Sequence, residues 1–221
     1  MSAPVAANDN GRLRALDLFC GAGGAGMGLH RAGYEVVGVD IAPQPNYPFQ
    51  FHQADAIGFP LGGFDFIWAS PPCQRYSLAC RNAGTAHLFP DLLPAMRERL
   101  RAVSCPWAIE NVPGAPMRAD ALLCGTMFGL RLIRHRLFET SFPIDRLVPP
   151  CRHKGDEVPV YGHGTPSWHR ERRGGAGIGI ELKREAMGIH WMNRDELSQA
   201  IPPAYSEFIA RAAMRARGVA A

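Results

Sequence analysis

Short apolar runs separated by polar or glycine-rich turns recur along the first half of the chain. They have the length of buried strands, and they occupy residues 13–19, 34–39, 64–69 and 107–109. The first run leads into a glycine-rich turn, and the helical stretch behind that turn ends near Ala32 and Gly33. Strand, glycine turn and helix in this order predict the first unit of a nucleotide-binding βαβ fold.

Two later stretches have the spacing of helices. Residues 88–103 carry apolar side chains on one helical face, namely Leu92, Leu93, Met96 and Leu100. Residues 203–215 predict a C-terminal helix that packs back against the first strands. The succession of strands and helices predicts an α/β fold of the Rossmann-like type, with a mostly parallel sheet and helices on both faces.

The composition is that of a globular chain with one core. A chain of 221 residues with 47% hydrophobic content can bury one sizeable core. Its six cysteines have no framework spacing, which favours reduced thiols and a cytoplasmic location. No apolar run is long enough to cross a membrane, and residues 1–12 predict a disordered start rather than a signal peptide.

Positive charge gathers in the later part of the chain. Residues 1–130 carry 9 Lys and Arg against 10 Asp and Glu, a net of −1, whereas residues 131–221 carry 15 against 10, a net of +5. A cofactor-binding part followed by a part that faces phosphates would have this asymmetry. A solvated surface with a modest basic excess is the alternative.

The turn at residues 20–28 predicts a ligand site. Its glycines let the backbone approach a ligand closely, and the helix behind them presents unpaired N–H groups. Asp40 ends the next strand about 20 residues further on, the distance at which a carboxylate reaches ribose hydroxyls. Asp55 follows a third strand. Asp40 has a second interpretation, because it would also cap the Pro-rich turn that follows it.

Cys73 lies on a loop with Pro71 and Pro72, directly after the apolar run that ends at Ala69. The prolines fix two φ angles, so the loop holds a small side chain in one direction. Parallel-sheet enzymes keep a nucleophile at such a strand end. A packed thiol is the alternative for Cys73, and it is our interpretation of Cys20, Cys80, Cys105 and Cys124.

Several motifs together resemble the DNA cytosine carbon-5 methyltransferase family. Residues 17–24 (Asp-Leu-Phe-Cys-Gly-Ala-Gly-Gly) resemble its first motif, and residues 71–74 (Pro-Pro-Cys-Gln) with Ser77 resemble its catalytic motif. Three later segments follow in the family's order, at residues 110–112, 134–139 and 187–209. The small size predicts a compact branch of the type found in phages and prophages.

The resemblance implies a monomeric S-adenosyl-L-methionine-dependent DNA (cytosine-5)-methyltransferase that acts on double-stranded DNA. It implies a cofactor site formed by Asp17, Phe19, Gly21, Gly23, Gly24, Asp40, Ile41, Asp55, Ala56 and Pro71. The cytoplasm of a bacterium or phage-infected host would be its location, and restriction–modification, phage DNA protection and regulation are the alternatives for its role. The same chemistry on RNA or a free pyrimidine nucleotide, and a non-catalytic nucleic-acid-binding relative, are the alternatives.

The family's chemistry assigns a role to each catalytic candidate. The Cys73 thiolate would add to carbon 6 of cytosine, because carbon 5 alone is a poor nucleophile. Glu110 would share a proton with ring N3, and Asn111 would orient the loop. Arg134 and Arg136, expected to alternate on one strand face, would favour the thiolate, and Arg136 would hold the base carbonyl. A solvated Glu110 and a solvated arginine edge are the ordinary alternatives.

Residues 141–185 are where the resemblance implies a small projecting lobe for target recognition. They separate a catalytic core at residues 13–140 from a segment at 186–221 that completes it. Aromatic and basic side chains mixed with glycine predict a nucleic-acid-facing loop there, among them Trp168, Arg170, Arg172 and Arg173. We assign no metal site. The alternative, a site from Cys151, His153, His163 and His169, lacks a strong zinc spacing.

Two departures from the family's pattern concern the cofactor site. Asp40 stands where a Glu is usual, which should change cofactor contacts only slightly. Residues 201–205 (Ile-Pro-Pro-Ala-Tyr) lack the usual Asn. The glycine turn must therefore be supported by other residues.

Overall fold

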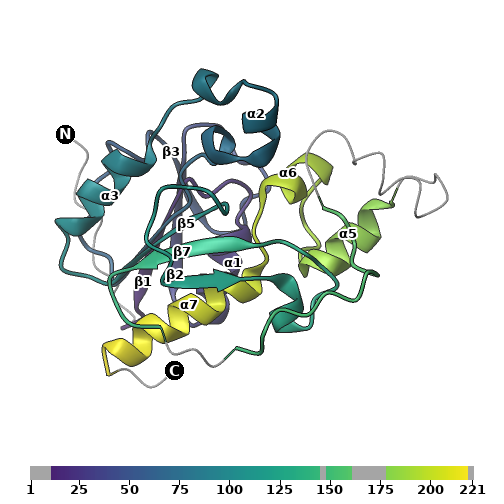
Figure 1. Ribbon diagram of the computed structural model, residues 1–221. Coiled ribbons are helices and arrows are strands. Elements are labelled where there is room, and N and C mark those ends of the chain that lie inside the picture. The colour runs from purple at the N-terminus through teal and green to yellow at the C-terminus, as the bar shows by residue number, and fades with distance from the viewer. Residues whose placement is uncertain (1–10, 145–147, 161–177, 219–221) are drawn as a thin grey trace.

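The computed structural model describes residues 11–144, 148–160 and 178–218. Within them the backbone forms one seven-stranded sheet in the order β3-β2-β1-β4-β5-β7-β6 (Figure 1). The strands are β1 (Arg14–Leu18), β2 (Glu35–Asp40), β3 (Gln50–Gln53), β4 (Phe66–Ala69), β5 (Trp107–Asn111), β6 (Ala121–Leu123) and β7 (Arg136–Thr140). Pairing is parallel from β3 to β5, whereas β7 runs antiparallel to both of its neighbours.

The central strands are buried along their whole length. Every residue of β1, β4 and β5 is buried, which is why these strands are largely apolar and do not alternate. Arg14, Asp17, Glu110 and Asn111 are the polar residues buried with them. Parallel strands of this kind need cover on both faces. The expectation of a mostly parallel α/β sheet with helices on both faces is confirmed.

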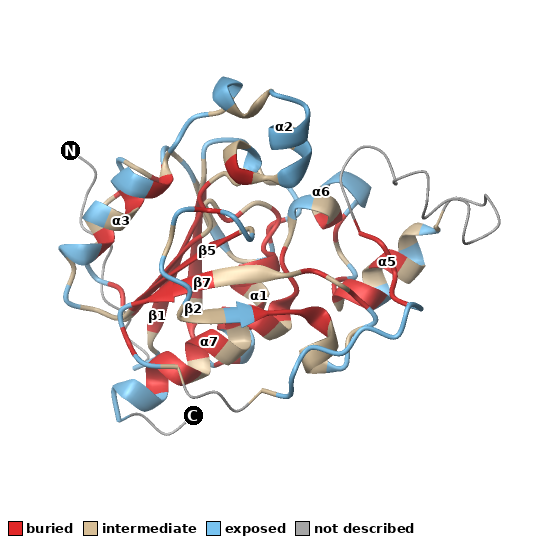
Figure 2. Cartoon of the chain, viewed as in Figure 1, coloured by how far each residue is buried: buried red, intermediate tan, exposed pale blue. Residues whose placement is uncertain are grey.

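Helices lie on both faces of the sheet (Figure 1). They are α1 (Gly24–Arg31), α2 (Leu78–Asn82), α3 (Leu93–Arg101), α5 (Ile180–Met187), α6 (Arg194–Gln199) and α7 (Pro203–Ala216), with 3₁₀ turns η1 (Gln74–Tyr76), η2 (Ala86–Leu88) and η3 (Gly125–Phe128). Among these described elements, α1 and α7 pack on one face and α3 on the other. Figure 2 shows the buried side of α7 turned toward the strands and its last turn exposed.

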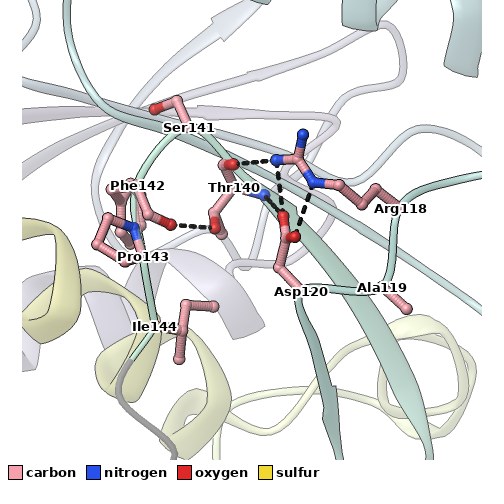
Figure 3. Close-up of a pocket in the computed structure, with 8 residues that line it drawn as sticks. All are labelled: Arg118, Ala119, Asp120, Thr140, Ser141, Phe142, Pro143 and Ile144. Atoms are coloured by element: carbon pink, nitrogen blue, oxygen red, sulfur yellow. Dashed lines mark hydrogen bonds and ion pairs between the residues drawn. The ribbon is translucent and has the colours of Figure 1, made fainter.

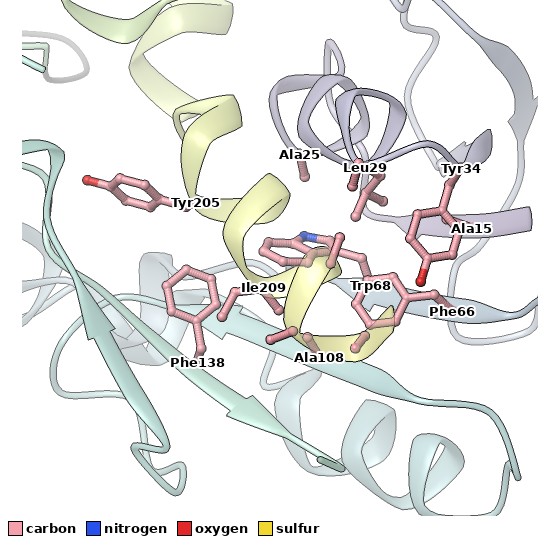
Figure 4. Packing of buried hydrophobic residues seen from close by; sticks show 14 of the residues in the cluster. Ala15, Ala25, Leu29, Tyr34, Phe66, Trp68, Ala108, Phe138, Tyr205 and Ile209 are labelled. Atoms are coloured by element: carbon pink, nitrogen blue, oxygen red, sulfur yellow. The ribbon is translucent and has the colours of Figure 1, made fainter. Parts of the chain in front are cut away.

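The core has a separate cluster on each face of the sheet. On the α1 and α7 face, Trp68 and Phe138 from the sheet pack with Tyr205 and Ile209 from α7 (Figure 4). On the other face, the buried stripe of α3 packs against β1, β2 and β4, as the apolar spacing predicts. In a third cluster, Val158 and Val160 pack against α5 and α6. These two valines lie at the end of the described range 148–160.

Two glycines let α1 approach the C-terminal segment closely. A Cβ on Gly28 would lie 2.1 Å from the Pro203 carbonyl oxygen and the Ser206 hydroxyl, and one on Gly24 would lie 2.6 Å from the Ile201 carbonyl. The Ser206 hydroxyl donates a 2.8 Å hydrogen bond to the Ala25 carbonyl at this contact. The glycine-rich sequence of α1 therefore serves helix packing as well as the turn.

The structure corrects three sequence predictions. The helix expected over residues 88–103 begins only at Leu93, because Pro90 precedes it and Pro94 sits in its first turn. The first strand ends at Leu18, because Phe19 has a positive φ of 59° and cannot continue it. Arg134 lies outside β7, so the two arginines do not alternate on one strand.

Two other expectations concern the ends and the insert. Residues 1–10 of the expected disordered start lie outside the described residues, as do residues 145–147 and 161–177 of the insert. Described residues of the insert pack in two of the core clusters, namely Phe142, Ile144 and Val148 in the first, on the α1 and α7 face, and Val158, Val160 and Ile178 in the third. The projecting lobe stays a prediction. No helix in the described ranges has both the length and the apolar character needed to span a membrane.

Candidate active site

The candidate residues gather at one edge of the sheet. The loops after β1, β2 and β4 leave from the carboxyl ends of parallel strands, and those ends share an edge. The reversed direction of β7 starts that strand at the same edge, since Asn111 at the end of β5 pairs with Leu137. The chain order reverses between β1 and β4, and such a switch point is where open α/β sheets bind their ligands.

Backbone and side-chain contacts fix the loop that carries Cys73. The Asn111 amide donates a 3.0 Å hydrogen bond to the Pro71 carbonyl, a buried contact that ties the end of β5 to the loop. The Cys73 carbonyl accepts the N–H groups of Tyr76 and Ser77, each at 3.0 Å, as η1 begins. Asn111 therefore has the loop-orienting contact that the family resemblance implies.

Glu110 lies buried at the end of β5, and two side chains, Arg136 and Ser70, bond to its carboxylate. The Arg136 Nε approaches its carboxylate at 2.9 Å, and both side chains are largely shielded from water. The Ser70 hydroxyl also hydrogen-bonds to this carboxylate, and the Trp68 indole N–H donates to that hydroxyl at 2.8 Å. Sequence reasoning missed Ser70 and Trp68. Their only signal was their position before Cys73, since Trp68 lies in β4 and Ser70 directly follows that strand.

Burial dominates the electrostatics of the two ionisable candidates. It raises the pKa of the Glu110 carboxyl, against the opposing effects of Arg136, Ser70 and Arg134. It also raises the pKa of the Cys73 thiol, and the negative charge of Glu110 raises it further, while both arginines lower it. The arginines thus favour the thiolate, as expected, but they do not outweigh burial and Glu110.

Arg134 makes different contacts from Arg136. Its guanidinium is buried and donates to the Val160 carbonyl at 2.8 Å and to the Ser198 carbonyl at 2.7 Å. Its own carbonyl accepts the hydroxyl of Tyr205 at 2.7 Å. Burial lowers the pKa of Arg134 to about 9, with a further lowering by the charge of Arg136. These bonds join the insert, the C-terminal segment and the arginine loop.

Asp40 joins the glycine turn to the end of β2. One carboxylate oxygen accepts the Gly21 N–H at 3.0 Å, and the other accepts the Ala42 N–H at 3.0 Å. Asp40 therefore does cap the turn after it, and each oxygen keeps a lone pair that a hydroxyl donor can use. The side chain of Ile41 beside it is 74% exposed, and Asp55 lies exposed after β3 with its carboxylate on the Ile57 N–H.

Most of the other predicted cofactor residues are buried and pack within the protein around the glycine turn and the neighbouring loops. Asp17 is fully buried and accepts the Tyr47 hydroxyl at 3.2 Å and the Gly26 N–H, and burial raises its pKa. A Cβ on Gly23 would meet Pro48 at 2.8 Å, whereas one on Gly21 would meet no atom within 4 Å. Only Gly21 of the turn glycines thus faces open space. Phe19 is half-buried, and Ala56 and Pro71 are buried.

Residues near the C-terminus support the glycine turn in place of the missing Asn. The Trp191 indole N–H donates to the Ala22 carbonyl at 2.8 Å, across 169 positions of sequence. The Asn46 amide donates to the Glu196 carboxylate at 2.9 Å and joins the loop after β2 to α6. Sequence reasoning did not single out Trp191 as a support, although it lies within the segment that resembles the last motif.

A separate hollow lies at the opposite edge of the sheet (Figure 3). It surrounds the end of β7, and Thr140 there pairs with Ala108 at the beginning of β5. Arg118 and Asp120 line it as an ion pair of 2.7 Å, and Asp120 also accepts the Thr140 N–H. Its charged groups satisfy one another, and none of the candidate residues reaches it.

The sheet and helices are those of a class of methyltransferases. A putative DNA modification methyltransferase encoded in an Escherichia coli prophage aligns with a TM-score of 0.57 at 15% identity, over 93% of this chain and 99% of that one. The Entamoeba histolytica methyltransferase EhMeth and the Schizosaccharomyces pombe Dnmt2 methyltransferase each align with a TM-score of 0.59, at 11% and 12% identity, over 92% of this chain and 98% of theirs. At such identities the likeness concerns the fold.

The sequence itself carries a likeness to one family. Residues 13–118 match the family model described as C-5 cytosine-specific DNA methylase, and this stretch contains both Cys73 and Glu110. Residues 13–118 are therefore similar to a C-5 cytosine-specific DNA methylase domain, as the motifs in this part of the chain indicated. A comparison with curated protein sequences found no match.

The coupling between Glu110 and Cys73 can be tested on the protein alone. We expect Glu110→Gln to lower the pKa of the Cys73 thiol, because it removes a negative charge while Arg136 remains. Alkylation of Cys73 by iodoacetamide near pH 7.5, followed by peptide mass spectrometry, should then become severalfold faster.

Two comparisons control this measurement. Cys80 in the same sample should react at an unchanged rate, and Glu98→Gln, which alters an exposed carboxylate on α3, should leave Cys73 unaffected. An equal or slower reaction of Cys73 in Glu110→Gln would contradict the coupling.

Proposed function

We propose that this protein transfers a methyl group from S-adenosyl-L-methionine to carbon 5 of cytosine in double-stranded DNA. The observation that carries the proposal is the group formed by Cys73, Glu110 and Arg136 at the switch-point edge. A nucleophile, a carboxyl with a raised pKa and a guanidinium joined to that carboxyl at 2.9 Å are the three functions that addition to a pyrimidine ring requires.

The proposed reaction begins with Cys73. Its thiolate adds to carbon 6, and the electron pair of the ring double bond becomes available at carbon 5 while Glu110 gives a proton to ring N3. The methyl group then moves to carbon 5, the carbon 5 proton leaves to a base, and elimination of Cys73 restores the double bond. Glu110 takes back the N3 proton in that last step.

The raised pKa of Glu110 serves two parts of this sequence. A raised pKa makes it easier for the carboxyl to take up the proton that it then donates to N3. Once neutral, it no longer opposes the thiolate of Cys73. Because the charge of Glu110 raises the pKa of Cys73, protonation of Glu110 favours ionisation of Cys73. Arg136 would hold the base carbonyl while it orients Glu110.

The residues at the ends of β1, β2 and β3 fit the proposed cofactor. Asp40 has free lone pairs for ribose hydroxyls, the exposed Ile41 offers an apolar surface to an adenine ring, and Gly21 leaves open space above the turn. When bound, the cofactor would supply a methyl group on a sulfonium. Phe19 and Asp55 flank the same edge and would complete the site.

The proposed DNA substrate depends on the later part of the chain. Cys73 cannot reach carbon 6 within a base stack, so the target cytosine would have to leave the duplex. We propose that residues 13–140 with 186–221 form the catalytic unit and that residues 141–185 read a short target. The net charge of +5 in residues 131–221 supports contact between this later part of the chain and the phosphates of DNA. RNA or a free pyrimidine nucleotide is the second candidate, because the insert is short.

The first prediction tests the covalent step. Cys73→Ser should abolish methyl transfer, because a hydroxyl is a far weaker nucleophile than a thiolate, while cofactor affinity stays within a few fold. With DNA containing 5-fluorocytosine, wild type should form an adduct that survives denaturation, because the fluorine cannot leave as a proton does. The adduct should be absent in Cys73→Ser. More than about a tenth of wild-type turnover in the variant would exclude Cys73.

A second prediction concerns Glu110 in the reaction. Glu110→Gln should reduce turnover by roughly a hundredfold or more at unchanged DNA affinity, because the amide has no proton to give to N3. The pH–rate profile should also lose its fall at high pH, which reports deprotonation of Glu110. A wild-type rate and profile in the variant would refute the role.

A third prediction separates cofactor binding from chemistry. Asp40→Asn keeps one acceptor and the shape of the residue, yet it should weaken S-adenosyl-L-methionine binding by roughly tenfold, since a hydrogen bond to a charged group is lost. Calorimetry measures the affinity, with Asp195→Asn as an exposed control. The single-turnover rate at saturating cofactor should be nearly unchanged, and equal affinity of the two proteins would end this assignment.

A fourth prediction decides the substrate. With a labelled methyl donor, duplex DNA should accept more label than RNA or deoxycytidine monophosphate. Replacing Arg170, Arg172 and Arg173 by Ala should weaken DNA binding and reduce its salt dependence by up to about 0.9 in log–log slope per lost phosphate contact. The matched control replaces Arg12, Arg31 and Arg101, which are exposed elsewhere. A better nucleotide substrate, or wild-type DNA binding by the first variant, would favour the nucleotide-modifying alternative.

A further inference from the structure

Four side chains that the proposed reaction does not use converge beside the arginine loop. They are Cys124, His135, Cys151 and His153, and one potential ligand atom from each lies within 4.8 Å of the other three. Cys124 follows β6, His135 lies directly before β7, and the other two belong to the described start of the insert. Three segments of the chain thus bring two sulfurs and two imidazole nitrogens to one point.

The distances are close to those of a tetrahedral metal site. Zn–S bonds of about 2.3 Å and Zn–N bonds of about 2.0–2.1 Å place neighbouring ligand atoms roughly 3.3–3.8 Å apart. The Cys124 sulfur lies 3.5 Å from the His153 Nε2, and the Cys151 sulfur lies 3.5 Å from the His135 Nε2. The Cys151 sulfur and the His153 Nε2 are 2.7 Å apart and would separate slightly around an ion.

Solvent exposure makes this convergence informative. Cys151 and His153 are exposed and His135 is half-buried, so water could satisfy all three if they pointed outward. They instead turn toward the buried Cys124. The Thr126 hydroxyl lies 3.6 Å from one sulfur and 3.5 Å from the other and accepts the Arg152 N–H at 3.3 Å. Backbone N–H groups of Thr126 and Arg134 also hydrogen-bond to the Cys124 sulfur. Such outer contacts orient metal-bound thiolates.

We propose that Cys124, His135, Cys151 and His153 hold one structural zinc ion. Two sulfurs and two imidazoles suit zinc and exclude the oxygen-seeking magnesium and calcium ions. Four protein ligands leave no open position, so the ion would bear on folding rather than on a reaction. The two thiols release their protons when the ion binds, and the thiolates balance its charge.

The site would fasten the insert to the catalytic edge. The His135 carbonyl accepts a 2.8 Å hydrogen bond from Arg136, which pairs with Glu110. An ion bound to the His135 ring would therefore hold the loop of Arg136 and the first residues of the insert as one unit. This replaces the expectation of no metal. Of the set weighed from sequence, Cys151 and His153 remain, while His163 and His169 lie outside the described residues.

The test measures metal content and does not need activity. The full chain is produced with zinc in the medium, purified without a histidine tag, and analysed by mass spectrometry of its metals. We expect about one zinc ion per chain for wild type and almost none for Cys151→Ser or His153→Asn. Cys80→Ser and His87→Asn, which alter a cysteine and a histidine in the α2–η2 region, should keep the full amount.

Two further readouts identify the ligands. Cobalt in place of zinc should give the absorption of a tetrahedral thiolate complex in wild type and not in Cys151→Ser. A chelator should lower the melting temperature of wild type, because it removes the bound ion that stabilises the folded protein. It should not change the melting temperature of Cys151→Ser, which would hold no ion. Circular dichroism verifies that each variant is folded.

The outcomes are distinct from those of the proposed function. Cys73→Ser should bind zinc fully, so loss of activity and loss of metal report on different sites. Wild type that contains no zinc after incubation with it would overturn the proposal. So would a Cys151→Ser protein that retains its zinc, or a disulfide between Cys124 and Cys151 in protein purified under reducing conditions.

Discussion

The antiparallel pairing of β7 with β5 is the constraint on which the candidate site depends. Because β7 runs against the rest of the central sheet, its first residue, Arg136, meets the last residues of β5 at the carboxyl edge. There it forms the 2.9 Å ion pair with the buried Glu110. A buried carboxylate without a partner would be strongly disfavoured, so the strand reversal is what allows Glu110 to sit beside Cys73. At the other end of β7, Glu139 is held by Arg97 of α3 at 2.9 Å, which fixes the strand to the helical layer behind the sheet.

Burial at this edge of the sheet disfavours the charged forms of Glu110 and Cys73 and thereby changes their acidity. It raises the pKa of Glu110 and of Cys73, so both groups favour their neutral forms more than solvated side chains of the same kind do. A carboxyl that keeps its proton is suited to donate it, and a thiol beside it gains nucleophilicity when that carboxyl becomes neutral. A change in the protonation of Glu110 therefore changes the ionisation of Cys73, which a permanent cation at the same place could not do.

The C-terminal segment and the start of the insert hold this edge in place from a distance in sequence. Trp191 supports the glycine turn, Ser206 holds α1, and Arg134 donates to both the insert and the segment before α7. The proposed zinc site would add a fourth tie next to Arg136. In the described residues, side-chain to backbone hydrogen bonds between distant parts of the sequence thus position the loops.

Local sequence determined the strands, the glycine turn, the Cys73 loop and the family resemblance, because the period of apolar residues and the geometry of Gly and Pro act over a few residues. The family resemblance supplied the expected roles of Glu110 and Arg136, and their ion pair was visible only in the structure. Tertiary structure alone decided which partners each side chain has. Arg134 donates to backbone carbonyls and does not lie on a strand face, and Asp40 accepts the Gly21 N–H. Cys124, expected to be a packed thiol, and His135, to which no role was assigned, belong to one cluster. These outcomes depend on how strands reverse and loops close, and contacts between residues far apart in sequence leave no periodic pattern along the chain.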